Sequence, residues 1–339
     1  MIKGHGDDRH QYKAVKANFS SNVCTDGVHA SLLSHLQAAL EHLHHYPEPC
    51  AETLTARLAQ HHHLAAEELL VCNGATEAFY LLAQHYRGAR SLIFIPSFAE
   101  YEDACVSATH SITYVENHLY ATTNYTDADL VWLCNPNNPD AYCYDFERLG
   151  EIIKANTQSL FIIDEAYIDF ACGQQSFIPL FATLQNVVII RSMTKRYAIP
   201  ALRLGYLIGS EKLIEGITEH LMPWRLNALA LSAGEYVLSS DYEDDFDPKA
   251  IIQRCAALQK ALGKIEGIEI YPSQASFFLL KSNVPAALLK QRLIDDYGLL
   301  IRDASNFRGL SPYHFRIAVQ SEEHNALLIN ALKEIFSND

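Results

Sequence analysis

One stretch organises the chain: Ile190-Arg191-Ser192-Met193-Thr194-Lys195-Arg196-Tyr197-Ala198-Ile199-Pro200-Ala201-Leu202-Arg203-Leu204-Gly205-Tyr206. The apolar run 187–190 that enters it is typical of a buried strand. Two hydroxyl residues precede Lys195, and Arg203 follows it. A nucleophilic lysine needs a fixed place at a strand end, and hydroxyls with an arginine suit a phosphate group. A polar loop with ordinary surface lysine and arginine residues is the alternative.

A lysine beside a phosphate-binding group suggests pyridoxal 5'-phosphate (PLP), which proteins hold as a lysine Schiff base. The chain has 339 residues, enough for two domains, and it is 49% hydrophobic, as globular proteins are. Its net charge of −14 argues against a nucleic-acid partner. The eight cysteines form no C-x-x-C pair, and several lie in apolar runs, which favours free thiols in a reducing compartment. We expect a cytoplasmic protein, because the N-terminus lacks the apolar core of a signal peptide and no apolar run approaches the roughly 18 residues that cross a membrane.

Histidine clusters occur twice, at residues 42–45 and 61–63. Neither cluster has cysteine or carboxylate partners at metal-ligand spacing. We therefore expect solvated helix surface at both clusters and no metal site.

Short apolar strands alternate with helices over the first two thirds of the chain, for example at 68–72, 130–134, 160–163 and 187–190. This pattern predicts an α/β fold with a mostly parallel sheet covered by helices on both faces. Alternating strands and helices near the C-terminus indicate a smaller α+β domain. The predicted organisation is an N-terminal arm (1–30) that joins the small domain, a large domain (31–225) and a small C-terminal domain (226–339). A leucine stripe predicts a helix over 31–45 that faces a core.

Polar residues follow the predicted strands at the ends where ligands bind in such sheets. Gly74, Ala75 and Thr76 come after one strand and open a helix, a geometry that binds phosphate but also occurs in simple capped turns. Asn138, Asp164 and Lys195 follow three other strands. Their common edge predicts a single site.

The ordered motifs resemble those of the fold-type I PLP enzymes, the aspartate-aminotransferase superfamily, over essentially the whole chain. They are Asn135-Pro136-Asn137-Asn138-Pro139, Asp164-Glu165-Ala166-Tyr167, Ser192-Met193-Thr194-Lys195 and Arg203-Leu204-Gly205-Tyr206. Tyr46-Pro47-Glu48-Pro49 is similar to the histidinol-phosphate aminotransferase branch. The stretches 5–6, 18–22, 96–101, 194–200 and 222–228 resemble the threonine-phosphate decarboxylases of cobalamin biosynthesis more distinctively. Asp140-Ala141 departs from the superfamily's Thr-Gly, and Asp7 and Val23-Cys24 depart from the motifs of the arm.

The resemblance implies a role for each candidate residue. Lys195 would carry PLP and move protons, Asp164 would face the pyridine nitrogen, and Tyr167 with Asn138 would bind the 3'-oxygen. The phosphate would be held by Gly74, Ala75, Thr76, Ser192, Thr194 and Arg203, with Phe98 stacked on the ring. Tyr46 would reach the active site of the neighbouring subunit, which implies a homodimer. Arg316 would clamp the substrate carboxylate, and Arg302, His5 and Asn22 would complete the substrate site.

For several of these residues a plainer reading stays open. In this alternative interpretation, Phe98 packs in the core, Asp164 caps a helix, and Arg316 is a surface charge at a strand edge. Single histidine and arginine residues such as His5 and Arg302 are common in arms and at strand ends.

The implied reaction is PLP-dependent decarboxylation of L-threonine O-3-phosphate to (R)-1-amino-2-propanol O-2-phosphate by a carboxy-lyase. Transamination of L-histidinol phosphate with 2-oxoglutarate is the alternative. The reaction depends on which bond of the substrate Cα stands perpendicular to the cofactor ring. No single residue here fixes that bond, so both reactions stay open. A catalytically silent PLP-fold binding protein is a third reading, against which the presence of Lys195 argues.

Overall fold

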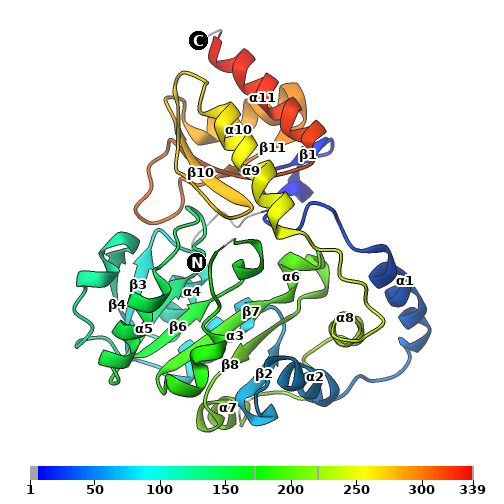
Figure 1. The fold of residues 1–339 in the computed structure, drawn as a ribbon, viewed down its shortest axis with the longest axis vertical. Coiled ribbons are helices and arrows are strands. Elements are labelled where there is room, and N and C mark those ends of the chain that lie inside the picture. The colour runs from blue at the N-terminus through cyan, green and yellow to red at the C-terminus, as the bar shows by residue number, and fades with distance from the viewer. Residues whose placement is uncertain (1–6, 172, 220, 338–339) are drawn as a thin grey trace.

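The computed structural model describes residues 7–171, 173–219 and 221–337, so His5 lies outside the described residues. The chain forms a larger body built on a seven-stranded sheet and a smaller body that lies above it (Figure 1). The N-terminal arm passes between the two bodies, since β1 (Ala17–Asn18) pairs in parallel with β11 (Leu299–Leu300). Through this pairing the arm contributes a strand beside the smaller body.

The large sheet has the strand order β2-β8-β7-β6-β5-β3-β4. All neighbouring strands run parallel except β8, which is antiparallel to both β2 and β7. The strands are β2 (Leu69–Cys72), β3 (Arg90–Ile95), β4 (Ser111–Glu116), β5 (Leu130–Cys134), β6 (Leu160–Asp164), β7 (Val187–Ser192) and β8 (Gly205–Ile208). The mostly parallel sheet that the apolar runs predict is thus present.

Helices cover both faces of this sheet, because its central strands are apolar at successive positions and alternate side chains enter opposite cores. In β5, Val131 packs on one face and Trp132 on the other. One face is covered by α1 (Ala30–Ala39), α2 (Glu52–His62), α5 (Phe146–Ala155) and α8 (Ala228–Val237). The other is covered by α3 (Ala75–His85), α4 (Ala99–Ser107) and α7 (Glu211–Thr218).

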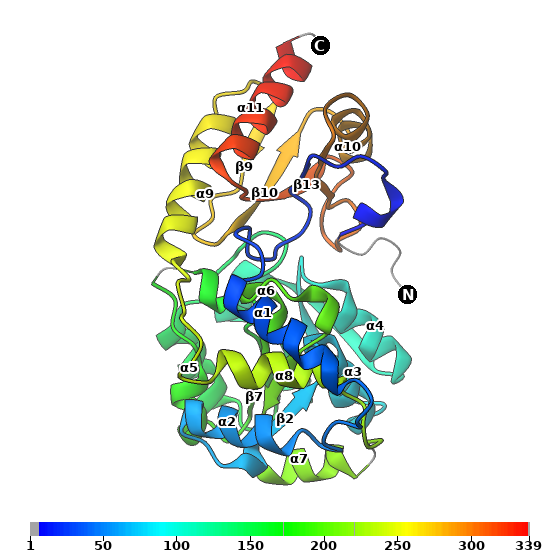
Figure 2. The same cartoon turned by 90° about the vertical axis from the view of Figure 1, so that its right-hand side faces the viewer.

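The smaller body is an antiparallel sheet of order β12-β13-β10-β9 with helices against it. Its strands are β9 (Ile268–Ile270), β10 (Phe277–Ser282), β12 (Arg302–Asp303) and β13 (His314–Ala318). Figure 2 shows α9 (Pro248–Leu262) and α11 (Glu322–Ser337) on one side of this sheet and α10 (Ala286–Arg292) on the other. A separate apolar core fills this body.

Two sequence expectations differ from the structure in detail. The helix predicted over 31–45 ends at Ala39 and continues as a single 3-10 turn, Leu40–His42. Only Leu32 of its leucine stripe is fully buried, while Leu33, Leu40 and Leu43 are exposed. Helix α8 packs on α1 and α2 in the larger body although it follows the predicted boundary at residue 225.

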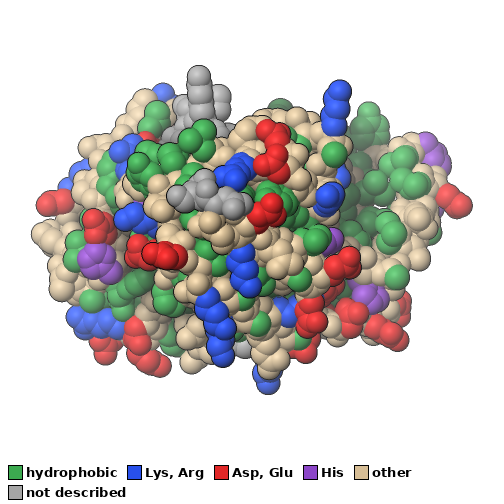
Figure 3. Space-filling model, turned by 90° about the horizontal axis from the view of Figure 1, so that it is seen from above, with side chains coloured by type: hydrophobic (Ala, Val, Ile, Leu, Met, Phe, Trp, Pro, Cys, Tyr) green, Lys and Arg blue, Asp and Glu red, His purple; other side chains and the backbone are tan. Residues whose placement is uncertain are grey.

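Among the described residues, no helix is long and apolar enough to cross a membrane. In the view from above, basic and acidic side chains are interspersed over the smaller body (Figure 3).

Candidate active site

A cavity of about 210 Å³ opens at the carboxyl ends of the parallel strands, beneath the smaller body. Most of the predicted site residues line it: Asn22, Ala75, Thr76, Phe98, Asn138, Asp164, Tyr167, Ser192, Thr194, Lys195, Arg203, Arg302 and Arg316. They come from the arm, from the carboxyl ends of five strands of the large sheet (β2, β3, β5, β6 and β7), from the residues just before β8, and from two strands of the small sheet. The single site expected from the common edge is therefore present as a cavity.

Lys195 lies in α6 (Met193–Arg196), the one-turn helix that follows β7. The arm holds this turn, because the Cys24 N–H donates to the Lys195 carbonyl oxygen at 2.8 Å. Burial lowers the pKa of the Lys195 amine to about 8, and the positive charges of Arg316 and Arg203 act in the same direction. Part of the amine is thus unprotonated near neutral pH, as a nucleophile or a base requires.

Asp164 is the last residue of β6 and is buried. Its Oδ1 accepts the Ala166 N–H at 2.9 Å, and its Oδ2 accepts the Tyr101 hydroxyl at 2.5 Å. Burial raises the pKa of this carboxyl to about 6, while the two hydrogen bonds and the Lys195 charge oppose the rise. A carboxylate of this kind suits a cationic partner inside the cavity.

The first turn of α3 and the residues around Arg203 form a cradle for an anion. Gly74 has φ +75°, a backbone conformation that favours glycine, and a Cβ at this position would lie 2.4 Å from Arg203 Nη2, so the guanidinium would have to shift. A Cβ at Gly205 would lie 2.7 Å from the backbone nitrogen of Ala75. The helix N-terminus, the hydroxyls of Ser192 and Thr194, and Arg203 together match the requirements of a phosphate group.

Tyr167 and Phe98 both line the cavity, and each also packs against other aromatic rings. The Tyr167 ring is 4.9 Å from that of Phe277, and burial raises the pKa of its hydroxyl to about 12. The Phe98 ring lies edge-on to Phe79 and Tyr101, at 6.3 and 6.0 Å between centroids. Phe98 packs against the core and also lines the cavity, and its stacking on a cofactor ring stays a prediction.

Arg316 enters the cavity from the small sheet and is buried. Its Nη1 donates to Asn138 Oδ1 at 2.5 Å and its Nη2 to the Ser20 carbonyl oxygen at 2.5 Å. Burial lowers the pKa of this guanidinium to about 10, which still leaves it charged at neutral pH. Arg316 therefore connects the smaller body, the arm and the 135–139 loop at one point.

Arg302 stands directly opposite Arg316 in the β12–β13 register. Its Nη2 donates to Asn306 Oδ1 at 2.8 Å, and its guanidinium lies 5.2 Å from the centroid of the Phe307 ring. Burial lowers the pKa of Arg302. Two arginines in directly opposed positions repel each other unless an anion lies between them.

Two predicted residues have less usual positions. Asn22 is buried at the cavity wall, and neither its amide nitrogen nor its amide oxygen forms a hydrogen bond of standard geometry among the described residues. Tyr46 lies away from this cavity: it is 85% exposed, and its ring is 5.4 Å from that of Trp224. Tyr46 does not reach the site of its own chain.

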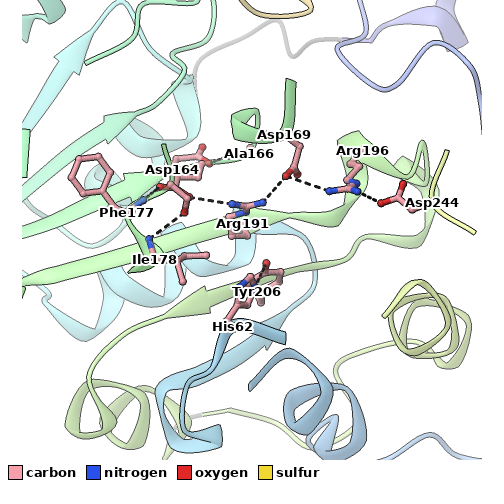
Figure 4. A network of polar contacts seen from close by, with 12 residues as sticks. His62, Asp164, Ala166, Asp169, Phe177, Ile178, Arg191, Arg196, Tyr206 and Asp244 are labelled. Carbon is pink, nitrogen blue, oxygen red and sulfur yellow. Dashed lines mark hydrogen bonds and ion pairs between the residues drawn. The ribbon is translucent and has the colours of Figure 1, made fainter. Parts of the chain in front are cut away.

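A chain of ion pairs lies behind the lysine turn (Figure 4). Arg191 contacts Glu165 at 3.2 Å and Asp169 at 2.8 Å, Arg196 is 3.6 Å from Asp169, and Arg196 also pairs with Asp244. This network joins β6, β7, α6 and the segment before α9.

His62 lies beside the same network, where its Nε2 is 2.8 Å from the Tyr206 hydroxyl. Burial lowers the pKa of His62 to about 4. The expectation of solvated histidines is therefore wrong for His62, although His61 and His63 are exposed. Within the described ranges, no group of three or more His, Cys, Asp or Glu residues could hold a metal ion.

Sequence reasoning missed three groups of residues at the site. Tyr101 lines the cavity and binds Asp164, but the sequence marks it only as the last residue of the stretch 96–101 and gives it no role. Asp7 lines the cavity from the arm, where the sequence marks it only as a departure from a motif, and Asn306 and Phe307 line the cavity from a segment with no motif. The Arg191 network was also missed, because its partners are scattered from residue 165 to residue 244.

The residues of the cavity fit PLP. A buried lysine at a strand end, a buried carboxylate and an anion cradle match the aldehyde, the ring nitrogen and the phosphate of that cofactor. The buried Asn22 amide, which lies beside the Tyr167 hydroxyl, supplies a further polar group at the cavity wall.

Comparison with known proteins places the chain in a family. The family model for aminotransferase class I and II matches residues 14–332, so the chain belongs to this family and is an enzyme of the PLP-dependent, aminotransferase-like kind. It is 31% identical to the threonine-phosphate decarboxylase of Salmonella typhimurium over 94% of this chain and 91% of the relative. It is 33% identical to the histidinol-phosphate aminotransferase of Caldanaerobacter subterraneus subsp. tengcongensis over 87% of this chain and 86% of the relative.

A solved structure is similar over nearly the full length. The L-threonine-O-3-phosphate decarboxylase from Porphyromonas gingivalis superposes with a TM-score of 0.92 at 36% identity, covering 95% of this chain and 100% of that chain. The predicted family and fold are thereby confirmed.

Proposed function

We propose that this protein is a PLP-dependent decarboxylase that acts on L-threonine O-3-phosphate and yields (R)-1-amino-2-propanol O-2-phosphate for cobalamin biosynthesis. The observation that carries this proposal is the opposed pair Arg302 and Arg316 at the wall of the lysine cavity. A substrate with both a carboxylate and a phosphate offers one anion to each guanidinium. Threonine phosphate has both groups, whereas L-histidinol phosphate has a phosphate and no carboxylate, so in the alternative aminotransferase only the dicarboxylate co-substrate could engage both arginines.

The chain's own residues would divide the work as follows. PLP, when bound, supplies an electron sink for the bond that breaks at the substrate Cα. Arg316 would orient the substrate carboxylate, and Asp164 would face the positive charge of the cofactor ring. Loss of CO₂ leaves a Cα that must receive a proton, and the Lys195 amine lines the same cavity and has a pKa lowered to about 8. Proton return by Lys195 completes the replacement of the carboxylate by hydrogen.

A substrate panel tests the proposal. The protein is incubated with PLP and either O-phosphothreonine or histidinol phosphate plus 2-oxoglutarate, and both released CO₂ and formed glutamate are measured. We expect CO₂ from phosphothreonine and little glutamate. Glutamate without CO₂ would instead establish the aminotransferase, the function that the relative of 33% identity carries.

The role of Arg302 gives a separate prediction. In an Arg302→Ala variant we expect the KM for the phosphorylated substrate to rise about 10- to 100-fold, the range of one charge-assisted hydrogen bond, while PLP affinity stays unchanged. Arg308→Ala is the control, because Arg308 lies nearby but pairs with Glu102 outside the cavity. Equal losses of substrate and PLP binding would assign Arg302 to structure alone.

We also propose that two copies of the chain form a homodimer in which Tyr46 reaches the partner's active site. Support comes from an exposed apolar surface, the dimer patch, formed by Leu33, Leu40, Leu43, Tyr46, Met222 and Trp224. Figure 3 shows hydrophobic side chains gathered with histidines at the right-hand edge, where α1 lies. Within this set the Tyr46 and Trp224 rings are in contact, and exposed apolar side chains gathered on one face of a folded chain often mark an interface.

This proposal predicts the effect of charge in the dimer patch. We expect the unaltered chain to have twice the mass of one chain by light scattering, and a Leu43→Glu/Trp224→Glu variant to shift toward the monomer, because burying two carboxylates is costly. Leu327→Glu on α11 is the control, since Leu327 is similarly exposed (42%) but lies on the smaller body. A monomeric unaltered chain would refute the proposed dimer.

A cytoplasmic location stays a prediction.

A further inference from the structure

Tyr101 is the residue to which the structure adds a role. It lies on α4, it is 1% exposed, and its hydroxyl points at Asp164 Oδ2 from 2.5 Å. Phe79, Phe98 and Trp132 surround its ring at centroid distances of 4.8, 6.0 and 6.1 Å. Because these rings pack around the phenol, its hydroxyl is held in a fixed direction toward Asp164.

The geometry points to Tyr101 as a positioning residue that holds Asp164 as an oriented anion for the ring nitrogen of the cofactor. This inference rests on the proposed use of PLP. A carboxylate has about four acceptor positions, and Tyr101 and the Ala166 N–H occupy one on each oxygen. The carboxylate is therefore fixed at both oxygens and keeps acceptor capacity for a ligand in the cavity that it lines.

A donor is needed here because burial alone favours the neutral acid. Burial raises the pKa of Asp164, and the Tyr101 hydrogen bond is the largest of the effects that lower it again. Other groups that face this carboxyl are Lys195 from α6, Cys134 from the end of β5 and the adjacent Glu165. A neutral Asp164 would donate a hydrogen bond to an unprotonated ring nitrogen. An ionised Asp164 instead favours a protonated ring nitrogen, and the protonated ring is the better electron sink.

The test compares PLP with its 1-deaza analogue, in which carbon replaces the ring nitrogen. For Tyr101→Phe we expect PLP affinity to fall about tenfold or more, as for loss of one charge-assisted hydrogen bond, while affinity for the analogue stays the same. The nitrogen NMR signal of bound ¹⁵N-labelled PLP should also move from the protonated toward the unprotonated position. Tyr125→Phe is the control, because Tyr125 is 3% exposed and its hydroxyl donates to the Tyr120 carbonyl oxygen away from the cavity.

Several outcomes would overturn the inference. Equal loss of both ligands, or no change in either, would make Tyr101 a packing residue. Should Tyr101→Phe not fold, 3-fluorotyrosine at position 101 keeps the shape with a stronger donor, and it must then tighten PLP binding relative to the analogue. An unaltered chain that bound neither ligand would overturn the proposed function and this inference together, whereas equal affinity for PLP and the analogue would overturn only the inference.

Discussion

A Lys195→Ala variant is expected to lose turnover and the visible absorbance of the lysine-linked cofactor together. The turnover loss should be at least about 10²- to 10⁴-fold, the contribution of one positioned proton-transfer group. Covalent attachment is lost as well, so the total effect is expected to be larger. Steady-state CO₂ release and absorbance spectra of the protein mixed with PLP measure the two effects.

Lys212→Ala is the matched control, because Lys212 lies on the exposed face of α7. It should keep both the activity and the absorbance. The prediction also requires that PLP still binds Lys195→Ala through its phosphate and ring contacts, and fluorescence titration would show this. A visible band that persisted in the variant would mean that another lysine carries the cofactor.

The sheet and the main site residues could be predicted because both depend on local sequence. Parallel strands buried on both faces appear as apolar runs, and the residues that follow these runs share one edge. The proximity of Asp164 and Lys195 could therefore be predicted without knowledge of the tertiary structure. Gly74 was predicted from its place in the turn after a strand. Its close contact with the Arg203 guanidinium could not be predicted, because Arg203 lies 129 positions later in the chain.

Features that depend on distant partners were not predictable. Tyr101 and Asp164 are 63 residues apart, and nothing in the sequence around Tyr101 identifies a distant carboxylate as its partner. The leucine stripe of α1 predicts burial, but periodicity does not say whether the same chain or a second copy covers it. Helix α8 was assigned to the small domain because the sequence after Trp224 has no signal for which core it enters.

The ion-pair network behind α6 has a large expected effect on stability. Glu165 has a fully buried side chain, and besides Arg191 it accepts the Ser176 hydroxyl at 2.6 Å and the Phe177 N–H at 2.7 Å. An Arg191→Met variant removes the charge partner and leaves the carboxylate buried. We expect the free energy of unfolding to fall by about 3–5 kcal/mol, the usual effect of breaking a buried pair from one side.

Urea unfolding at a fixed protein concentration measures this change, since association would otherwise alter the midpoint. Arg148→Met is the matched control: Arg148 forms a 3.1 Å pair with Glu151 on the surface, with side chains 52% and 68% exposed, and its loss should cost less than about 1 kcal/mol. Similar losses in both variants would show that the Arg191 pair contributes no more than a surface pair.

The pH dependence of the Arg191→Met effect separates a charge effect from a packing effect. Burial already raises the pKa of Glu165 in the folded chain, while Arg191 opposes the rise, so removing Arg191 raises this pKa further. A carboxyl whose pKa is higher in the folded than in the unfolded chain favours folding when protonated, and this contribution is lost as pH rises through the folded pKa. The destabilisation should therefore be smaller near about pH 5 than above about pH 7. A loss of packing by the arginine stem would be the same at both pH values, and the urea midpoints at the two pH values decide between these causes.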